Sequence, residues 1–216
     1  MGLFTINSKM KNSAKGKSIK VINFTLPAFQ TKDGFKTCPN AGVCASGCYA
    51  RMGAYVWPKV YAKHRANLDA TQHALFEQIA GLELSKLKPT HVRIHDSGDF
   101  YNADYFLKWC RIADRHSHIQ FYAYTKMIEL VKFYQGLYQV PKNLTIIFSL
   151  GGKQDEMIDQ TTDRHSRVFN TEAELLEAGY IDASHDDMLA ITPNPKVGLV
   201  YHGNKKYDNT AWNKVK

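Results

Sequence analysis

Long apolar runs are missing from this sequence of 216 residues. None approaches the roughly 20 apolar residues that a membrane-spanning helix needs. The amino terminus also lacks the apolar core that a secretory signal peptide carries. We therefore expect a soluble, cytoplasmic protein with no membrane partner.

Acidic residues are scarce, and the first of them is Asp33, whereas residues 7–20 carry five lysines. The formal net charge is +8. We predict that residues 1–20 form a basic N-terminal arm, which is either a solvated tail or a segment that neutralises the phosphates of DNA. Residues 21–216 are expected to form a single catalytic domain, because this length and a hydrophobic content of 44% suffice for one buried core.

Cysteines are also few, but three of the four lie within eleven residues: Cys38, Cys44 and Cys48. The segment 36–53 around them is rich in Pro, Asn, Gly and Ser, so a bound metal would give it the order that a core cannot. The clustering of three of the four cysteines favours metal or cluster binding over a secreted disulfide framework. We predict a metal loop rather than chance clustering of buried cysteines.

Zinc is the metal that we expect, and a fourth ligand must come from elsewhere in the chain. His202 is our first choice and His64 the alternative. An iron–sulfur cluster with three thiolates and one open iron site is the other possible occupant. Cys110, in the apolar face of "FLKWCRIA", is predicted to be a core residue.

Segments of strand and helix character alternate from about residue 91 onwards. The expected strands are "HVRIHDSG", "IQFYAYTK", "LTIIFSLGG", "SRVFN" and "DMLAITPN", after an earlier one in "SIKVINFTLPAF". Alternation of this kind predicts parallel strands with right-handed crossovers. We predict an α/β fold, a reduced or partial (β/α) TIM-like barrel with an N-terminal cysteine loop. An open doubly wound sheet is the alternative.

The ends of these strands are polar, and in barrels the carboxyl ends of the strands build the active site. Asp96 and Asp99, in "RIHDSGDFYN", are the leading candidates. Two carboxylates this close in a dry pocket should differ in pKa, so that one acts as an anion and the other handles a proton. The other candidates, for substrate binding, are His95, Ser97, Phe100, Lys126, Ser149, Gly151 and Gly152.

The combination of "CPNAGVCASGCYAR", "HDSGDFYNADYF" and "FYAYTK" resembles a group of uncharacterised phage proteins, over residues 35 to 202. "DSGDF" also resembles the Asp-Ser-Gly-Gly motif of the tRNA-guanine transglycosylases, and "SLGG" resembles their Gly-Gly base-binding turn. Those enzymes are zinc-bearing (β/α) barrels. Their phage relatives, the DNA-guanine transglycosylases, exchange guanine in DNA for a 7-deazaguanine, which protects the genome from restriction enzymes.

The resemblance implies that Asp96 recognises the base and assists proton transfer, and that Gly151 and Gly152 face the heterocycle. "HDDMLAITPNP" loosely matches the nucleophile strand of these enzymes, with Asp186 or Asp187 as the acid; Asp187 is our choice. A carboxylate would attack C1′ of a flipped deoxyguanosine and displace guanine, and the incoming 7-deazaguanine would then displace the carboxylate. The sequence departs from the family at Asp99, which replaces a glycine, and in its cysteine spacing.

Two other functions compete with base exchange. Radical enzymes that use S-adenosylmethionine are also partial barrels with a three-cysteine loop near the N-terminus, usually spaced Cys-x3-Cys-x2-Cys. The spacing here is Cys-x5-Cys-x3-Cys. A zinc-containing DNA-binding accessory protein would explain the charge and the cysteines, but it would give Asp96 and Asp99 no role.

Overall fold

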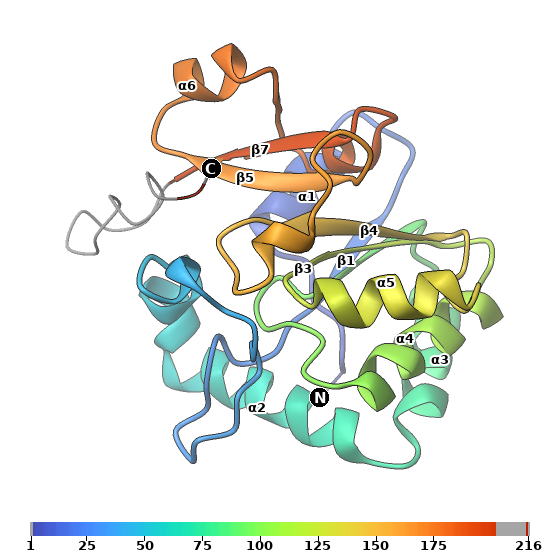
Figure 1. Cartoon of the computed structure of the whole chain (residues 1–216). Coiled ribbons are helices and arrows are strands. Elements are labelled where there is room, and N and C mark those ends of the chain that lie inside the picture. The colour runs from blue at the N-terminus through green and yellow to red at the C-terminus, as the bar shows by residue number, and fades with distance from the viewer. Residues whose placement is uncertain (1, 202–214, 216) are drawn as a thin grey trace.

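The computed structural model describes residues 2–201 and 215, and its centre is a curled sheet of seven parallel strands (Figure 1). Along the sheet the strand order is β1-β2-β3-β4-β5-β7-β6. Within the described residues β1 and β6 are the two edges, so the sheet is a half-barrel. The strands are β1 (Val21–Phe24), β2 (His91–Ile94), β3 (Gln120–Thr125), β4 (Leu144–Ser149), β5 (His165–Phe169), β6 (Ile181–Asp182) and β7 (Lys196–Val200).

Helices precede or follow most of these strands. The α-helices are α1 (Ser8–Ala14), α2 (Pro58–Gln72), α3 (Phe76–Leu87), α4 (Ala103–Arg115), α5 (Ile128–Gly136) and α6 (Glu172–Glu177). Five 3-10 helices are η1 (Val43–Ala45), η2 (Tyr49–Arg51), η3 (Gly53–Val56), η4 (Asp155–Met157) and η5 (Asp187–Ile191). None of the helices in the described ranges is long and apolar enough to cross a membrane.

The two faces of the sheet carry different side chains because successive residues of a strand point to opposite sides. On β3, Phe121 and Ala123 pack into a large apolar core with α3, α4 and α5. Tyr122 points to the other, concave face, where a smaller cluster includes Met10 of α1 and Ala190 of η5. Figure 1 shows α1 and the helices α3 to α5 on opposite sides of the sheet. The concave face is therefore closed by the two ends of the described chain.

Helix α4 illustrates how the sequence determines an element. Asn102 caps it by accepting a hydrogen bond from the backbone N–H of Tyr105 at 2.9 Å. Its apolar stripe is buried against the sheet, with Trp109 fully buried and Cys110 3% exposed. The prediction that Cys110 is a core residue is therefore confirmed.

The parallel α/β architecture is confirmed, and the sequential order from β1 to β5 differs from the reversed order of a doubly wound sheet. One predicted strand is wrong. "DMLAITPN" forms η5, because the Asp186 side chain caps the N–H of Met188 and starts a helical turn. The strand follows later, as β7, directly after Pro195.

Residues 2–14 also differ from the expected basic arm. Asn7 caps α1 by accepting from the N–H of Met10, and Met10 is fully buried on the concave face. Leu3 and Phe4 join the large core. The lysines alone predicted a solvated segment, but the apolar residues between them and the cap at Asn7 attach this segment to the sheet.

We predict that Met10→Ala lowers the free energy of unfolding by about 2–5 kcal/mol, the usual cost of emptying a buried site of this size. Lys11→Ala, one residue away on the exposed face of α1, should change it by less than about 0.5 kcal/mol. Urea denaturation of both variants measures the difference. Equal and negligible effects would mean that residues 2–14 are a detached arm.

Candidate functional site: a thiol-lined cavity at the mouth of the half-barrel

A cavity of about 190 Å³ lies at the carboxyl ends of the strands. Side chains that follow β2, β3 and β4 form one wall, and the cysteine loop between β1 and α2 forms another. Residues at the ends of β5 and β7 complete it. Its main polar lining residues are Arg93, His95, Asp96, Ser97, Asp99, Tyr124, Thr125, Lys126, Ser149 and the three cysteines Cys38, Cys44 and Cys48.

The turn after β2 is sharply bent. His95 has a φ of +67° and Gly98 has a φ of +86°, both in the left-handed region. A Cβ atom at Gly98 would lie 2.6 Å from Cβ of Leu26, so a glycine is required there for space as well as for φ. His95 is buried, and burial together with the charge of Arg93 lowers its pKa to about 3. The imidazole is therefore neutral, and its Nε2 lies 2.7 Å from the Tyr105 hydroxyl.

Asp99 is held by three donors. Its Oδ1 accepts from the N–H of Phe100 at 2.7 Å and the hydroxyl of Thr125 at 2.6 Å, and its Oδ2 accepts from the N–H of Lys126 at 2.9 Å. Burial raises the pKa of Asp99, and these hydrogen bonds oppose the shift. The carboxylate therefore ties the turn after β2 to the end of β3.

Asp96 has a different environment. Its Oδ2 accepts from Asn7 Nδ2 at 2.9 Å and from the Tyr55 hydroxyl at 2.6 Å. Its Oδ1 lies 3.8 Å from Nη1 of Arg93. Asp96 and Asp99 thus share none of these partners, and they do not form a proton-sharing pair. Asp96 also lines the cavity, and its Oδ2 accepts both hydrogen bonds while its Oδ1 is near Arg93 alone.

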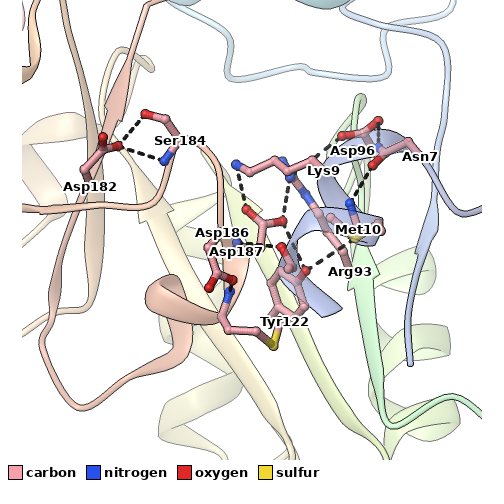
Figure 2. Close-up of polar contacts among 12 residues, drawn as sticks. Asn7, Lys9, Met10, Arg93, Asp96, Tyr122, Asp182, Ser184, Asp186 and Asp187 are labelled. Carbon is pink, nitrogen blue, oxygen red and sulfur yellow. Dashed lines mark hydrogen bonds and ion pairs between the residues drawn. The ribbon is translucent and has the colours of Figure 1, made fainter. Parts of the chain in front are cut away.

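Beneath the cavity, a buried ionic cluster joins α1, β2 and η5 (Figure 2). Asp187 accepts from Arg93 Nη1 at 2.7 Å and pairs with Lys9 Nζ at 2.7 Å. The Tyr122 hydroxyl donates to the same carboxylate at 3.1 Å. Burial favours protonation of Asp187, but the charges of Arg93 and Lys9 lower its pKa below the usual value. Asp187 is fully buried and outside the cavity lining, so this geometry gives it the role of counter-ion rather than of nucleophile.

All three clustered cysteines line the cavity. Burial raises the pKa of the Cys38 thiol and that of the Cys48 thiol. The nearby charges of Lys126 and Arg51 favour the thiolate of Cys48. In the described part of the chain, no group of three His, Cys, Asp or Glu side chains is arranged to hold a single metal ion.

The Gly-Gly turn after β4 supports the cysteine loop. The carbonyl of Gly151 accepts from the N–H groups of Gly42 and Cys44, both at 3.2 Å. A Cβ at Gly42 would lie 2.7 Å from the carbonyl oxygen of Gly152, so the two backbones touch. The N–H groups of Gly151 and Gly152 donate to Asp155 at 2.7 and 2.8 Å. The geometry therefore gives these glycines a docking role, and their amides are not free for a base.

The remaining predicted residues separate into two groups. Lys126 and Ser149 both line the cavity and are joined by a hydrogen bond of 2.6 Å. Ser97 lines it too, with its hydroxyl bonded to the carbonyl of Leu26. Phe100, in contrast, is fully buried in the large core. His64 is buried on α2 next to Tyr55, and His202 lies outside the described residues.

Sequence reasoning missed four contributors to this site: Asn7, Arg93, Tyr49 and Tyr55. One signal was available for Arg93, because a charge between Val92 and Ile94 in a sheet that is covered on both faces requires a buried counter-ion. Tyr49 and Tyr55 carry no such signal. The centroids of their rings are 5.5 Å apart, and the Tyr49 hydroxyl donates to the backbone carbonyl of Asp96.

A family model described as "Gene product 88" matches residues 1–214. The chain belongs to this family. It is 31% identical over 125 residues to the "Gene 88 protein" of Mycobacterium phage D29. The match covers 52% of this chain, and it spans only about half (51%) of the phage protein. No solved structure matches the chain significantly.

Asp187→Asn should lower the free energy of unfolding by about 3–5 kcal/mol, because it leaves the buried Arg93 and the half-buried Lys9 without their shared counter-ion. Asp186→Asn is the matched control. Asp186 pairs with Lys17 at the surface, and asparagine also caps helices, so this change should cost less than about 1 kcal/mol. Chemical denaturation of the two variants gives the comparison. Similar losses for both would show that the buried cluster is not the stabilising feature.

Proposed function

We propose that this protein is an iron–sulfur enzyme of the type that uses S-adenosylmethionine, with Cys38, Cys44 and Cys48 as the cluster ligands. The observation that carries the proposal is the position of the three thiols. They follow the first strand of a parallel half-barrel and line one cavity at its carboxyl edge, which is where barrel enzymes have their active sites.

Three thiols on one cavity suit either a zinc ion or an iron–sulfur cluster. Thiolates are the ligands of both, but a tetrahedral zinc with bonds of about 2.3 Å draws its sulfurs to within about 4 Å of one another. Among the described residues, no three His, Cys, Asp or Glu side chains form a group that could hold one metal ion. In a cluster each thiolate binds a different iron, so wider spacing is accommodated, and three thiolates leave one iron for a ligand. The proposed protein would differ from such enzymes mainly in its cysteine spacing, which is longer than the usual Cys-x3-Cys-x2-Cys.

Cys38, Cys44 and Cys48 would hold the cluster, which would supply one-electron reduction of S-adenosylmethionine, with the electron taken from an external reductant. The chain supplies the binding groups. Oδ1 of Asp96 can accept from a cationic group of a ligand, and Lys126 Nζ can pair with an anionic one. The guanidinium of Arg93 is 5.1 Å from the centroid of the Tyr124 ring. This cation–π contact holds Tyr124, an aromatic residue of the cavity lining, in place.

A transglycosylase that inserts a 7-deazaguanine into DNA is the second candidate, and the observation in its favour is Asp96. This carboxylate lines the cavity between aromatic side chains, as a base-recognising or nucleophilic acid would. Two features speak against it. Asp99 already accepts three hydrogen bonds that hold the turn after β2, and Gly151 and Gly152 donate to Asp155 instead of facing a ligand.

The proposal predicts iron and acid-labile sulfide in equal amounts in protein that is purified without oxygen, together with visible absorption that bleaches on reduction. Cys38→Ala, Cys44→Ala and Cys48→Ala should each lose most of the iron. Cys110→Ala is the matched control, because Cys110 is packed in the core of α4 and should leave the iron content unchanged. The loaded protein should also form 5′-deoxyadenosine from S-adenosylmethionine and dithionite.

Colourless protein with stoichiometric zinc would contradict this proposal. Incorporation of a labelled 7-deazaguanine into DNA, abolished in Asp96→Asn, would then favour the transglycosylase. Equal iron loss in Cys110→Ala would also count against the assignment of ligands, since the effect would reflect folding.

A further inference from the structure

The surface beside the cavity is formed by residues 49–59, "YARMGAYVWPK", which we call the rim. It contains η2 and η3 and ends in the first turn of α2 (blue to cyan in Figure 1). Trp57 is 62% exposed and Val56 is 55% exposed. Tyr49 belongs to both the rim and the cavity lining. An exposed tryptophan is unusual, because large aromatic side chains are mostly buried.

The rim and its neighbours are also basic. Residues 29–65 contain six lysines and arginines and one acid, Asp33. That acid is already paired with Arg65 at 2.7 Å. The other exposed cations have no carboxylate partner in the described part of the chain: Lys32, Lys36, Arg51 and Lys59.

Aromatic side chains lie between this basic surface and the lining of the cavity. Arg51 lies 5.2 Å from the Phe29 ring centroid, and Phe29 lines the cavity. The ring centroids of Tyr49 and Tyr55 are 5.5 Å apart, and the Tyr55 hydroxyl donates to the Asp96 carboxylate. A ligand that contacts the rim therefore has flat apolar surfaces along its path to Asp96.

We propose that the rim binds a single-stranded segment of nucleic acid and directs one nucleotide toward the cavity. Exposed cations contact phosphates, and Trp57 provides a stacking surface for a base. Cations interleaved with aromatic side chains are the combination that single-strand-binding proteins use. A stacked duplex base cannot enter a cavity of this kind, because enzymes that act on bases must first extrude them. This inference extends the proposed function by naming its substrate class, but the rim residues include none of the three thiols.

The test measures binding of the full-length protein to a fluorescent single-stranded oligonucleotide, in DNA and RNA forms, by anisotropy across a range of salt concentrations. Trp57→Ala should weaken binding about tenfold or more, the usual effect of removing one stacking partner. Arg51→Ala and Lys59→Ala should each reduce the slope of log affinity against log salt by about 0.7.

The matched controls lie away from the rim. Tyr138→Ala removes an aromatic side chain that is 96% exposed at the end of α5. Lys86→Ala and Lys142→Ala remove exposed lysines that precede β2 and β4, at the amino ends of the strands and so at the end of the sheet opposite the cavity. All three controls should bind like the unchanged protein. If they lose as much affinity as the rim variants, the attraction is general and the proposal is wrong.

Failure of this inference is distinguishable from failure of the proposed function. Rim variants that bind the oligonucleotide as the unchanged protein does would overturn the rim proposal and leave the iron content untouched. Tighter binding of a duplex than of either single strand would also overturn the rim proposal. So would a protein partner that binds at Trp57 and is not displaced by an excess of oligonucleotide. Binding retained in Cys38→Ala, Cys44→Ala and Cys48→Ala, but lost in Trp57→Ala, would support the rim whatever metal the thiols hold.

Discussion

The buried charge of Arg93 is the constraint on which the rest of the structure depends. It stands between Val92 and Ile94 on a strand whose other face packs into the apolar core, so its guanidinium must enter the concave face of the sheet. A buried cation is tolerated only with a counter-ion. Asp187, 94 residues later in the chain, supplies it at 2.7 Å. Lys9 joins the same carboxylate from the N-terminal helix.

This charge cluster explains why the concave face is polar and still closed. Segments from the beginning and the end of the described chain meet at one carboxylate, so the floor beneath the cavity is assembled only in the folded chain. Asn7, in the same N-terminal segment, then reaches Asp96 above that floor. The cavity is closed on a second side by the backbone contact between Gly42 and the Gly151–Gly152 turn, which holds the cysteine loop against the end of β4. The thiols and the carboxylate of Asp96 are thereby presented to one space from fixed supports.

Periodicity was sufficient to predict most of the fold. Alternation of apolar residues located the strands β2 to β5, and the apolar stripe of α4 correctly placed Cys110 in the core. The same reasoning failed at "DMLAITPN", where a local cap by Asp186 outweighs a strand-like composition. It failed also at residues 2–14, because long-range contacts, which leave little trace in composition, bind a lysine-rich segment to the sheet.

Part of the site could also be predicted from the sequence. The carboxyl ends of parallel strands share one edge, so Asp96, Lys126 and Ser149 could be expected near one another, and they line one cavity. What the residues do there depends on three-dimensional detail. Asp99 and Asp96 are three positions apart and both line the cavity, yet Asp99 accepts hydrogen bonds at both of its oxygens, whereas Asp96 accepts them at Oδ2 only. Spacing alone cannot separate a carboxylate that holds a turn together from one that is available to a ligand.

The most direct test of the central claim is a crystal structure of protein prepared without oxygen, with diffraction recorded on both sides of the iron and zinc absorption edges. We predict anomalous density for several irons in the cavity, in contact with the sulfurs of Cys38, Cys44 and Cys48. We also predict Asp96 on the wall of the same cavity. A single zinc peak on these cysteines, or thiols that face away from one another with no metal between them, would contradict the central claim.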